Sequence, residues 1–318
     1  MRFIRKKTYS QTNESQVLLG NWKYKLCAER IILQKNGMKR LNIKEQIQLQ
    51  PDWLKKVTVI HTQAKEAGGS FPILLPFAWD EVMCRQIEKK SGPLLHIWRH
   101  PRAFVVGLRD RKLPYAEQAM DWLRGEGYDT AVRNSGGAAV PLDAGVVNLS
   151  LVLPNPEGKM DFHQDFRFMV SLLRQVISPW TDSVQDGEIR GSYCPGDYDL
   201  AIGGRKFCGI AQRRQARGFV IQAFVVVEGR GTDRASVARR FYEIASRGDS
   251  ALAYPRVSDT SMGSLAELAN VPSAEAFAQR TVEVVREAGG CLREIGPAEL
   301  LNPEIEQTMT LLKNRYDR

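Results

Sequence analysis

The chain has 318 residues, of which 43% are hydrophobic and 25% are charged, and its formal net charge is +9. This composition excludes a disordered, collagen-like or coiled-coil chain and is typical of one large or two small globular domains. The charge excess is local: residues 1–60 hold 13 Lys and Arg against 4 Asp and Glu, and the rest of the chain is balanced. We therefore expect no nucleic-acid partner for the globular part.

Membrane, export and metal signals are weak. A membrane-spanning helix needs roughly 20 apolar residues in a row, which the sequence lacks, and the basic N-terminus has no apolar core of a secretory signal. The five cysteines form no CxxC pair, which favours a reducing compartment, the cytoplasm. The four histidines pair with no cysteine or carboxylate at zinc-ligand spacing, so we predict no metal site. From the lack of a long apolar stretch we predict no membrane association.

In chain order, residues 1–60 are interpreted as a basic N-terminal extension and residues 61–318 as the globular domain. Met38 offers a second start, which would leave residues 1–37 outside the native protein. A helix is predicted for residues 77–90, and the runs LLHIW and AFVVGL are interpreted as a hairpin. A helix after Pro114 and the strand DTAVR then lead into the segment NSGGAAVPLDAG.

The centre of the chain is rich in strand patterns. Strands are predicted for residues 146–153, 198–202, 206–212 and 219–227, with a helix at 162–176, and further helices follow at 236–247, 274–288 and 298–313. Strands in the middle with helices at both ends predict an α+β fold, with a mostly antiparallel central sheet flanked by helices.

The first segment with chemical potential runs from Arg133 to Asn148. Its paired glycines, Gly136 and Gly137, let a ligand approach the backbone closely, and successive N–H groups there can cradle an oxygen. A tight connection between strands explains the glycines equally well. The segment is not a phosphate-binding P-loop, because the GxxxxGK[ST] spacing is missing.

The second segment is GSYCPGDYDL followed by IGGRKFCG. Cys194 lies in a turn and not on an apolar face, so a nearby cation could hold it as a nucleophilic thiolate. Lys206 lies on the return strand beyond Gly203-Gly204 and is one candidate cation, while Arg205 is an equal competitor. Arg213 and Arg214, together with Arg217, are either a solvated strand end or a basic cluster that docks an acidic protein.

The other cysteines are better explained by packing. Cys208 alternates with apolar residues in a strand, and Cys84 lies on the inner face of a helix. No histidine lies in either glycine-rich segment, so a Ser-His-Asp arrangement is not indicated.

These two segments resemble the lipoate and octanoate attachment family, the lipoyl ligases and octanoyltransferases related to biotin protein ligase. The family pattern R-x-x-G-G-G-x-V-x-H-D-x-G-x-x-N is matched at seven positions: Arg133, Gly136, Gly137, Val140, Asp143, Gly145 and Asn148. Ala138 replaces the third glycine and Leu142 replaces the histidine. The segment GSYCPGDYDLAIGGRKFCGIAQRR is similar to the motif of family members that carry a cysteine after a Ser-Tyr pair.

The resemblance implies a biotin/lipoyl protein ligase-like catalytic domain with an acyl tunnel, in which Cys194 accepts the acyl chain and Lys206 stands beside the reacting carbonyl. It also implies a set of substrate-binding residues: Arg133, Ser135, Gly136, Gly137, Ala138, Asp143, Gly203 and Gly204. Leu142 and the cysteine together resemble the amidotransferases of the family. These take octanoate from the octanoylated glycine cleavage H protein and pass it to lipoyl domains of oxo-acid dehydrogenase complexes.

This interpretation predicts exchange of one lysine amide for another through an acyl-Cys194 thioester, with no ATP and no other cofactor. Loop N–H groups at residues 135–138 would stabilise the oxyanion, and Lys206 would move the proton. Three alternatives remain: an octanoyltransferase that uses acyl carrier protein as donor, an ATP-dependent lipoate ligase, and a noncatalytic ligand-binding or nucleic-acid-binding protein.

Overall fold

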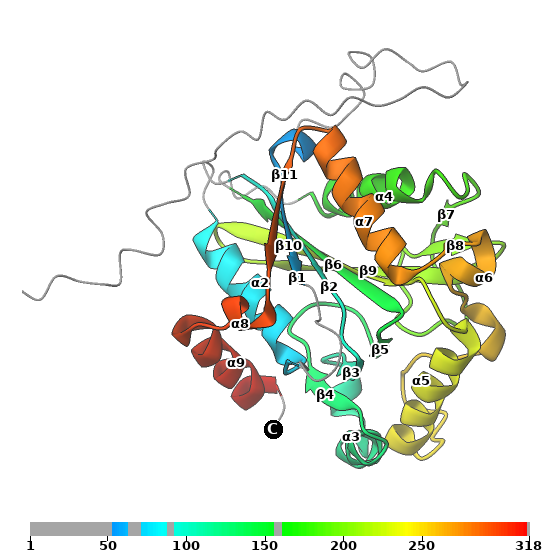
Figure 1. Ribbon diagram of the computed structural model, residues 1–318. Helices are drawn as coiled ribbons and strands as arrows, with labels where there is room; N and C mark the ends of the chain where they lie inside the picture. The colour runs from blue at the N-terminus through cyan, green and yellow to red at the C-terminus, as the bar shows by residue number, and fades with distance from the viewer. Residues whose placement is uncertain (1–52, 63–70, 88–91, 156–160, 317–318) are drawn as a thin grey trace, which may run out of the picture. The chain divides into compact units, whose positions relative to one another are not determined.

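The computed structural model describes residues 53–62, 71–87, 92–155 and 161–316, which form two β-sheets with helices packed against them (Figure 1). The predicted extension lies outside these residues except for its last part, residues 53–60. In the described part of the chain, no helix is both long and apolar enough to cross a bilayer.

The large sheet has the spatial order β11–β1–β2–β6–β10–β9–β8–β7. Its strands are β1 (Thr58–Thr62), β2 (Leu94–Trp98), β6 (Val146–Pro154), β7 (Gln185–Asp186), β8 (Leu200–Ile202), β9 (Arg205–Arg214), β10 (Gly218–Val226) and β11 (Cys291–Ile295). The small sheet has the order β4–β3–β5, with β3 (Arg102–Val106), β4 (Asp129–Val132) and β5 (Val140–Asp143). Pairing is antiparallel except at β11–β1, β1–β2 and β3–β4.

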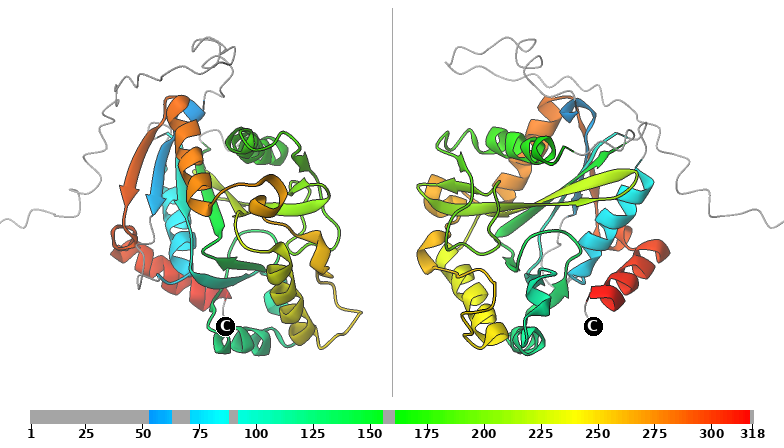
Figure 2. Two further views of the ribbon diagram at one scale, coloured as in Figure 1. Left: turned by 45° about the vertical axis from the view of Figure 1, so that its right-hand side comes forward. Right: turned by 180° about the vertical axis from the view of Figure 1, so that it is seen from behind.

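Helices cover both faces of the large sheet, with α4 and α7 on one face and α2 with the small sheet on the other (Figure 2). Their bounds are α2 (Leu74–Gln86), α3 (Ala116–Gly125), α4 (Phe162–Ile177), α5 (Gly231–Ser246), α6 (Leu265–Ala269), α7 (Ala274–Glu287), α8 (Pro297–Leu300) and α9 (Pro303–Tyr316). Short 3₁₀ turns lie at Leu54–Lys56, Asp110–Lys112 and Asp259–Ser261.

Alternation along the central strands separates two hydrophobic cores. On β10, Val220 and Phe224 point into the core beneath α2 and the small sheet, whereas Ile221 and Val225 point into the core beneath α4 and α7. This is the period of two that a strand imposes on its side chains. A strand buried on both faces is mostly apolar, as residues 146–153 are apart from Asn148 and Ser150.

The predicted hairpin is wrong. β2 pairs with β1 and β6 in the large sheet, while β3 pairs with β4 and β5 in the small sheet. The three residues between the two strands therefore carry the chain from one sheet to the other. Because every residue of β2 is buried, it can serve as an inner strand with neighbours on both sides.

Two boundaries also differ from the prediction. Residues 58–60 belong to β1, and Leu54 is fully buried beneath α7, so the folded domain begins before residue 61. The partner strands β2 and β11 lie far along the sequence, which explains why no local pattern marks β1. The helix predicted at 298–313 is two helices, α8 and α9, because Asn302 caps a new helix at Pro303 through bonds from the N–H groups of Glu304 and Ile305.

Candidate active site

Cys194 lies in the turn between β7 and β8, with a backbone φ of 47°. This left-handed conformation is uncommon for a residue with a side chain and requires support from its surroundings. Lys206 gives that support, because its Nζ donates to the carbonyl oxygens of Tyr193 at 2.9 Å and Cys194 at 2.5 Å. Lys206 therefore fixes the shape of the turn that presents the thiol.

A buried ion pair holds Lys206 in place. Its Nζ lies 2.8 Å from Asp199 Oδ2, and the two side chains are 0% and 1% exposed. Burial raises the pKa of Asp199 to about 6, while the charge of Lys206 and its hydrogen bond act in the opposite direction. Asp199 also accepts a bond from Gly196 N, so one carboxylate links the lysine to the Cys194 turn.

The sulfur of Cys194 contacts the first glycine-rich segment. Arg133 Nη2 lies 3.2 Å from Sγ, and the backbone N–H of Ala138 lies 3.3 Å from it. Among the described residues, the cation in hydrogen-bond contact with the Cys194 sulfur is thus Arg133. Lys206 contacts the backbone carbonyl of Cys194 instead. The sequence predicts Lys206 or Arg205 as the cation beside the thiolate. Arg205 instead pairs with Glu267 and Met262 O.

Gly137 is required where the two segments meet. Its φ is 92°, and a Cβ atom at this position would lie 2.4 Å from Arg133 Nη2 and 2.9 Å from Cys194 Sγ. Both distances are shorter than any normal contact. The backbone of the loop can therefore approach the thiol and the guanidinium only because residue 137 has no side chain.

A second buried carboxyl group lies behind the loop. Burial raises the pKa of Asp110 to about 6, and Tyr242, the charge of Arg133 and backbone N–H groups act to lower it. Tyr242 Oη in turn accepts a bond from Ala139 N at 3.2 Å. Asp110 and Tyr242 thus fix the far side of the loop that bears Arg133.

Glu81 on α2 fixes the near side of the same loop. Its carboxylate accepts two bonds from Arg213, at 2.6 and 3.1 Å, and one from Asn134 Nδ2 at 2.8 Å. Arg214 pairs with Asp165 on α4. Arg213 and Arg214 are therefore paired with carboxylates inside the molecule, whereas Arg217, the third arginine of the predicted cluster, is exposed.

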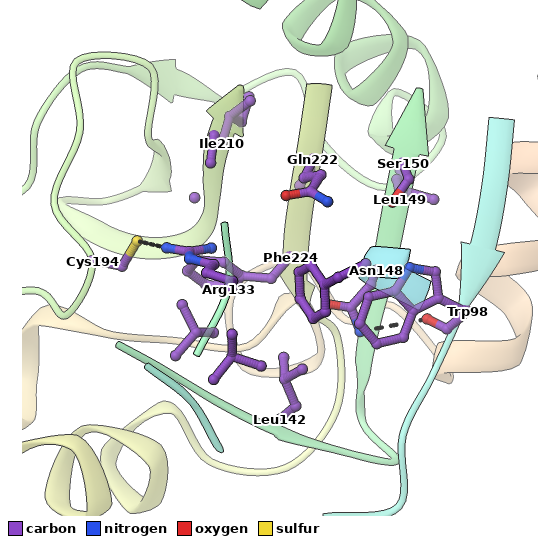
Figure 3. Close-up of a pocket in the computed structure, with 16 residues that line it drawn as sticks. Trp98, Arg133, Leu142, Asn148, Leu149, Ser150, Cys194, Ile210, Gln222 and Phe224 are labelled. Atoms are coloured by element: carbon purple, nitrogen blue, oxygen red, sulfur yellow. Dashed lines mark hydrogen bonds between the residues drawn. The ribbon is translucent and has the colours of Figure 1, made fainter. Parts of the chain in front are cut away.

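Cys194 stands at one end of a mostly apolar pocket of about 420 Å³, measured with its open mouth (Figure 3). The pocket crosses the large sheet from β9 over β10 and β6 to Trp98 on β2. The lining consists of the apolar residues Phe77, Trp98, Val105, Val140, Leu142, Leu149, Ile210, Ala211, Ala223 and Phe224, with Gly209 and the polar residues Arg133, Asn148, Ser150, Cys194 and Gln222. A pocket of this kind suits an aliphatic chain attached to the sulfur.

A second, more open cavity lies on the other side of the loop. It is lined by Ser135, Gly136, Gly137 and Ala138 together with Pro195, next to the cysteine, and by Tyr254. The thiol thus stands between the apolar pocket and this second cavity, so one reactant can occupy each side of it. The contribution of residues 253–255 to this cavity was not predicted, because no sequence motif marks them.

Three predicted substrate-binding residues lie apart from the thiol. Asp143 forms a bidentate pair with Arg234, at 2.6 and 2.8 Å, and caps the turn at Gly145. Gly203 and Gly204 form the exposed β8–β9 turn, with φ values of 58° and 75° and open space around them. In the structure, the two glycines and Asp143 shape turns, and none of them lines the pocket at Cys194.

The remaining cysteines of the described residues are free and buried or half-buried. Burial raises the pKa values of Cys84 and Cys208 well above the usual value, so both side chains are held as neutral thiols. Their prediction as packing residues agrees with these positions. Cys27 lies outside the described residues.

Residues 72–286, more than half of the chain, match the family described as lipoyl protein ligase A/B catalytic domain. The chain belongs to this family. It is 43% identical over 203 residues to the octanoyl-[GcvH]:protein N-octanoyltransferase of Geobacillus kaustophilus, which covers 63% of this chain and 72% of that protein. The protein of the same name from Exiguobacterium sibiricum is 38% identical over 253 residues, or 79% of this chain and 91% of its own.

Solved structures agree with this family at the level of fold. A lipoate-protein ligase A bound with ATP superimposes with a TM-score of 0.59 at 19% identity, over 83% of this chain and 96% of that one. A bi-partite lipoate protein ligase from Thermoplasma acidophilum gives a TM-score of 0.57 at 18% identity, over 83% and 93%. The α+β class with a mostly antiparallel sheet, and its resemblance to the ligase family, are confirmed.

Proposed function

We propose that this chain is an amidotransferase that moves an octanoyl group from an octanoyl-lysine of the glycine cleavage H protein to a lysine of a lipoyl domain. The observation that carries the proposal is the free thiol of Cys194, held by Arg133 and Ala138 N–H at one end of an apolar pocket. The names of the two relatives support the same donor and the same acyl group.

In the first half-reaction, the Cys194 thiolate attacks the amide carbonyl of the octanoyl-lysine. A C–S bond forms, the C–N bond breaks, and the lysine amine leaves with a proton. The sulfur loses its negative charge as the new bond forms, so Arg133 and Ala138 N–H are left beside the developing oxyanion. Donors already in position at the start of the reaction stabilise such a charge most strongly.

Lys206 is proposed as the proton carrier. Its Nζ lies 2.8 Å from Asp199 Oδ2, and it must exchange a carbonyl contact of the turn for the leaving amine. In the second half-reaction, the acceptor lysine attacks the thioester and returns a proton to Lys206, while the Cys194 thiolate leaves. Overall one lysine amide replaces another, and the cycle needs neither ATP nor another cofactor.

The pocket favours this reaction over the ATP-dependent ligase. Leu142 occupies the histidine position of the family pattern and lies 2% exposed in the pocket wall, where it adds apolar contact for an acyl chain. A ligase that activates its acid with ATP has no need of a thiol at that pocket. Discrimination between the H protein and acyl carrier protein depends on the protein surface and is decided by the experiment below.

A free thiol is essential to the scheme, so the proposed location is the reducing cytoplasm. The proposed partners are octanoylated H protein as donor and the lipoyl domains of oxo-acid dehydrogenase complexes as acceptors. No nucleic acid and no membrane takes part in the proposed reaction.

The test is intact-protein mass spectrometry after incubation with octanoyl-H protein, without nucleotide. We expect a mass increase of one octanoyl group, located on Cys194 by peptide mapping and discharged when a lipoyl domain is added. Octanoyl-acyl carrier protein is the matched donor. A faster reaction with that donor would replace the proposal with the sister octanoyltransferase, and an absolute need for ATP would replace it with the ligase.

A further inference from the structure

Beyond the part next to Cys194, the pocket wall on β10 and β6 carries polar side chains. Gln222 on β10 and Ser150 on β6 are paired across the sheet, and both line the pocket. Their side chains meet the carboxyl group of Asp80, which enters from α2. Asp80 Oδ2 accepts bonds from Ser150 Oγ at 2.8 Å and Gln222 Nε2 at 2.5 Å. We call Ser150 and Gln222, which line the pocket, together with Asp80, which supports them from outside the lining, the polar wall.

The polar wall retains unused hydrogen-bonding atoms. Asp80 Oδ1, Gln222 Oε1 and the nearby Trp98 Nε1 are buried without a hydrogen-bond partner among the described residues. Figure 3 shows the amide oxygen of Gln222 on the side of Ile210 and its nitrogen on the side of Ser150. Water or a polar group can satisfy such atoms, whereas a methylene group pressed against them leaves them unsatisfied.

The distance from the thiol to the polar wall matches the acyl chain. An extended chain advances about 1.2 Å per bond, so the seven carbon–carbon bonds of an octanoyl group span roughly 8 Å. Neighbouring strands lie about 4.8 Å apart, so β9 and β6 are separated by roughly 9.5 Å. An octanoyl chain that starts beside β9 and crosses the sheet therefore ends over β6, where Ser150 stands.

We propose that the polar wall of Asp80, Ser150 and Gln222 limits the length of the acyl chain that this enzyme accepts. This inference rests on the proposed function, in which Cys194 carries the acyl group. Packing alone does not demand these polar side chains. Asp80 lies on the buried face of α2, is 1% exposed and packs next to the apolar core, where an aliphatic side chain of similar size would fill the same space.

The expected effect follows from the hydrophobic gain of each methylene group. Burial of one CH₂ against an apolar wall improves binding about fourfold, so two extra methylenes improve it about 15-fold. In the wild type, the two extra methylenes of a decanoyl chain would lie against polar atoms, so they add no hydrophobic binding energy. When the wall is made apolar, the ratio of decanoyl to octanoyl transfer should rise by about 15-fold.

The experiment uses p-nitrophenyl esters of hexanoic, octanoic, decanoic and dodecanoic acid, which acylate a thiol without a carrier protein. The variant is Asp80→Leu/Ser150→Ala/Gln222→Leu, and the rate of acylation is followed by release of nitrophenolate with Cys194→Ser as the blank. The matched control is Thr281→Val, which removes a buried hydroxyl bonded to Phe277 O on the opposite face of the sheet.

We expect the wild type and Thr281→Val to acylate fastest with the octanoyl ester, and the triple variant to prefer decanoyl or dodecanoyl. An unchanged decanoyl to octanoyl ratio would overturn the inference and leave the proposed function intact. Absence of Cys194 acylation by every ester would refute the proposed function itself. If the triple variant fails to fold, Gln222→Met alone keeps the Ser150–Asp80 bond and should raise the ratio about fourfold, and no rise would overturn the inference.

Discussion

Replacement of Lys206 by alanine should unfold the protein more easily as well as impair transfer. Lys206 is fully buried and lies 2.8 Å from Asp199, which is itself 1% exposed. Its removal leaves a buried carboxylate with no cationic partner. Loss of one member of a buried ion pair typically lowers the free energy of unfolding by about 3–5 kcal/mol. For a domain of this size the melting midpoint should fall by roughly 6–20 °C.

The loss should depend on pH in a defined direction. Burial raises the pKa of Asp199 to about 6 in the folded protein, above its ordinary value of 3.8. When the pKa of a carboxyl group is higher in the folded than in the unfolded protein, the folded state binds the proton more tightly. The group then stabilises the folded protein at pH values below its unfolded pKa, and this stabilisation is lost as the pH rises through the folded pKa. Lys206 is one of the groups that lower this pKa, so its loss raises the pKa of Asp199 further. Folding with a protonated Asp199 costs more free energy at pH 8 than at pH 5, so Lys206→Ala should be more harmful at pH 8.

The assay is urea unfolding of the wild type and Lys206→Ala at pH 5 and pH 8, followed by circular dichroism. The matched control is Lys206→Ala/Asp199→Asn, which removes the carboxylate together with its partner and should recover most of the lost stability at pH 8. Equal stability losses at the two pH values, or no recovery in the double variant, would refute this account. Transfer assays of Lys206→Ala belong at a temperature where the variant is folded.

Four further outcomes are expected. Cys194→Ser should abolish the acyl-enzyme in mass spectra and leave the melting midpoint within a few degrees, because the smaller hydroxyl can keep the contacts from Arg133 and Ala138 N–H. Arg133→Met should slow iodoacetamide alkylation of Cys194 at neutral pH about 10-fold or more, since a hydrogen bond to a charged group contributes about 1.5–3 kcal/mol; an unchanged rate would show that Arg133 does not stabilise the thiolate. Gly137→Ala should cut transfer at least about tenfold in steady-state assays, because its Cβ would lie 2.4 Å from Arg133 Nη2, and wild-type turnover would contradict the required close approach. A protein that starts at Met38 should melt and transfer like the full chain, and failure of either measurement would make residues 1–37 structural.

Much of the fold was accessible from local pattern. The strand at residues 146–153, the helix at 162–176 and the strands around 206–227 were predicted close to β6, α4, β9 and β10. Their apolar residues repeat with the period of the element that they form, so each signal lies within a window of some ten residues. The strands β1 and β11 carry five residues each and pair in parallel with distant segments, and neither was predicted.

For the site, the nucleophile candidate and its two segments could be predicted, because the family motifs and the turn around Cys194 consist of adjacent residues. The contacts of the sulfur could not. Arg133 is 61 residues from Cys194, and the approach of its guanidinium depends on the missing Cβ of Gly137 and on how Asp110 and Glu81 fix the loop. Contacts between distant segments follow from packing of the whole core, which no local pattern of residues encodes.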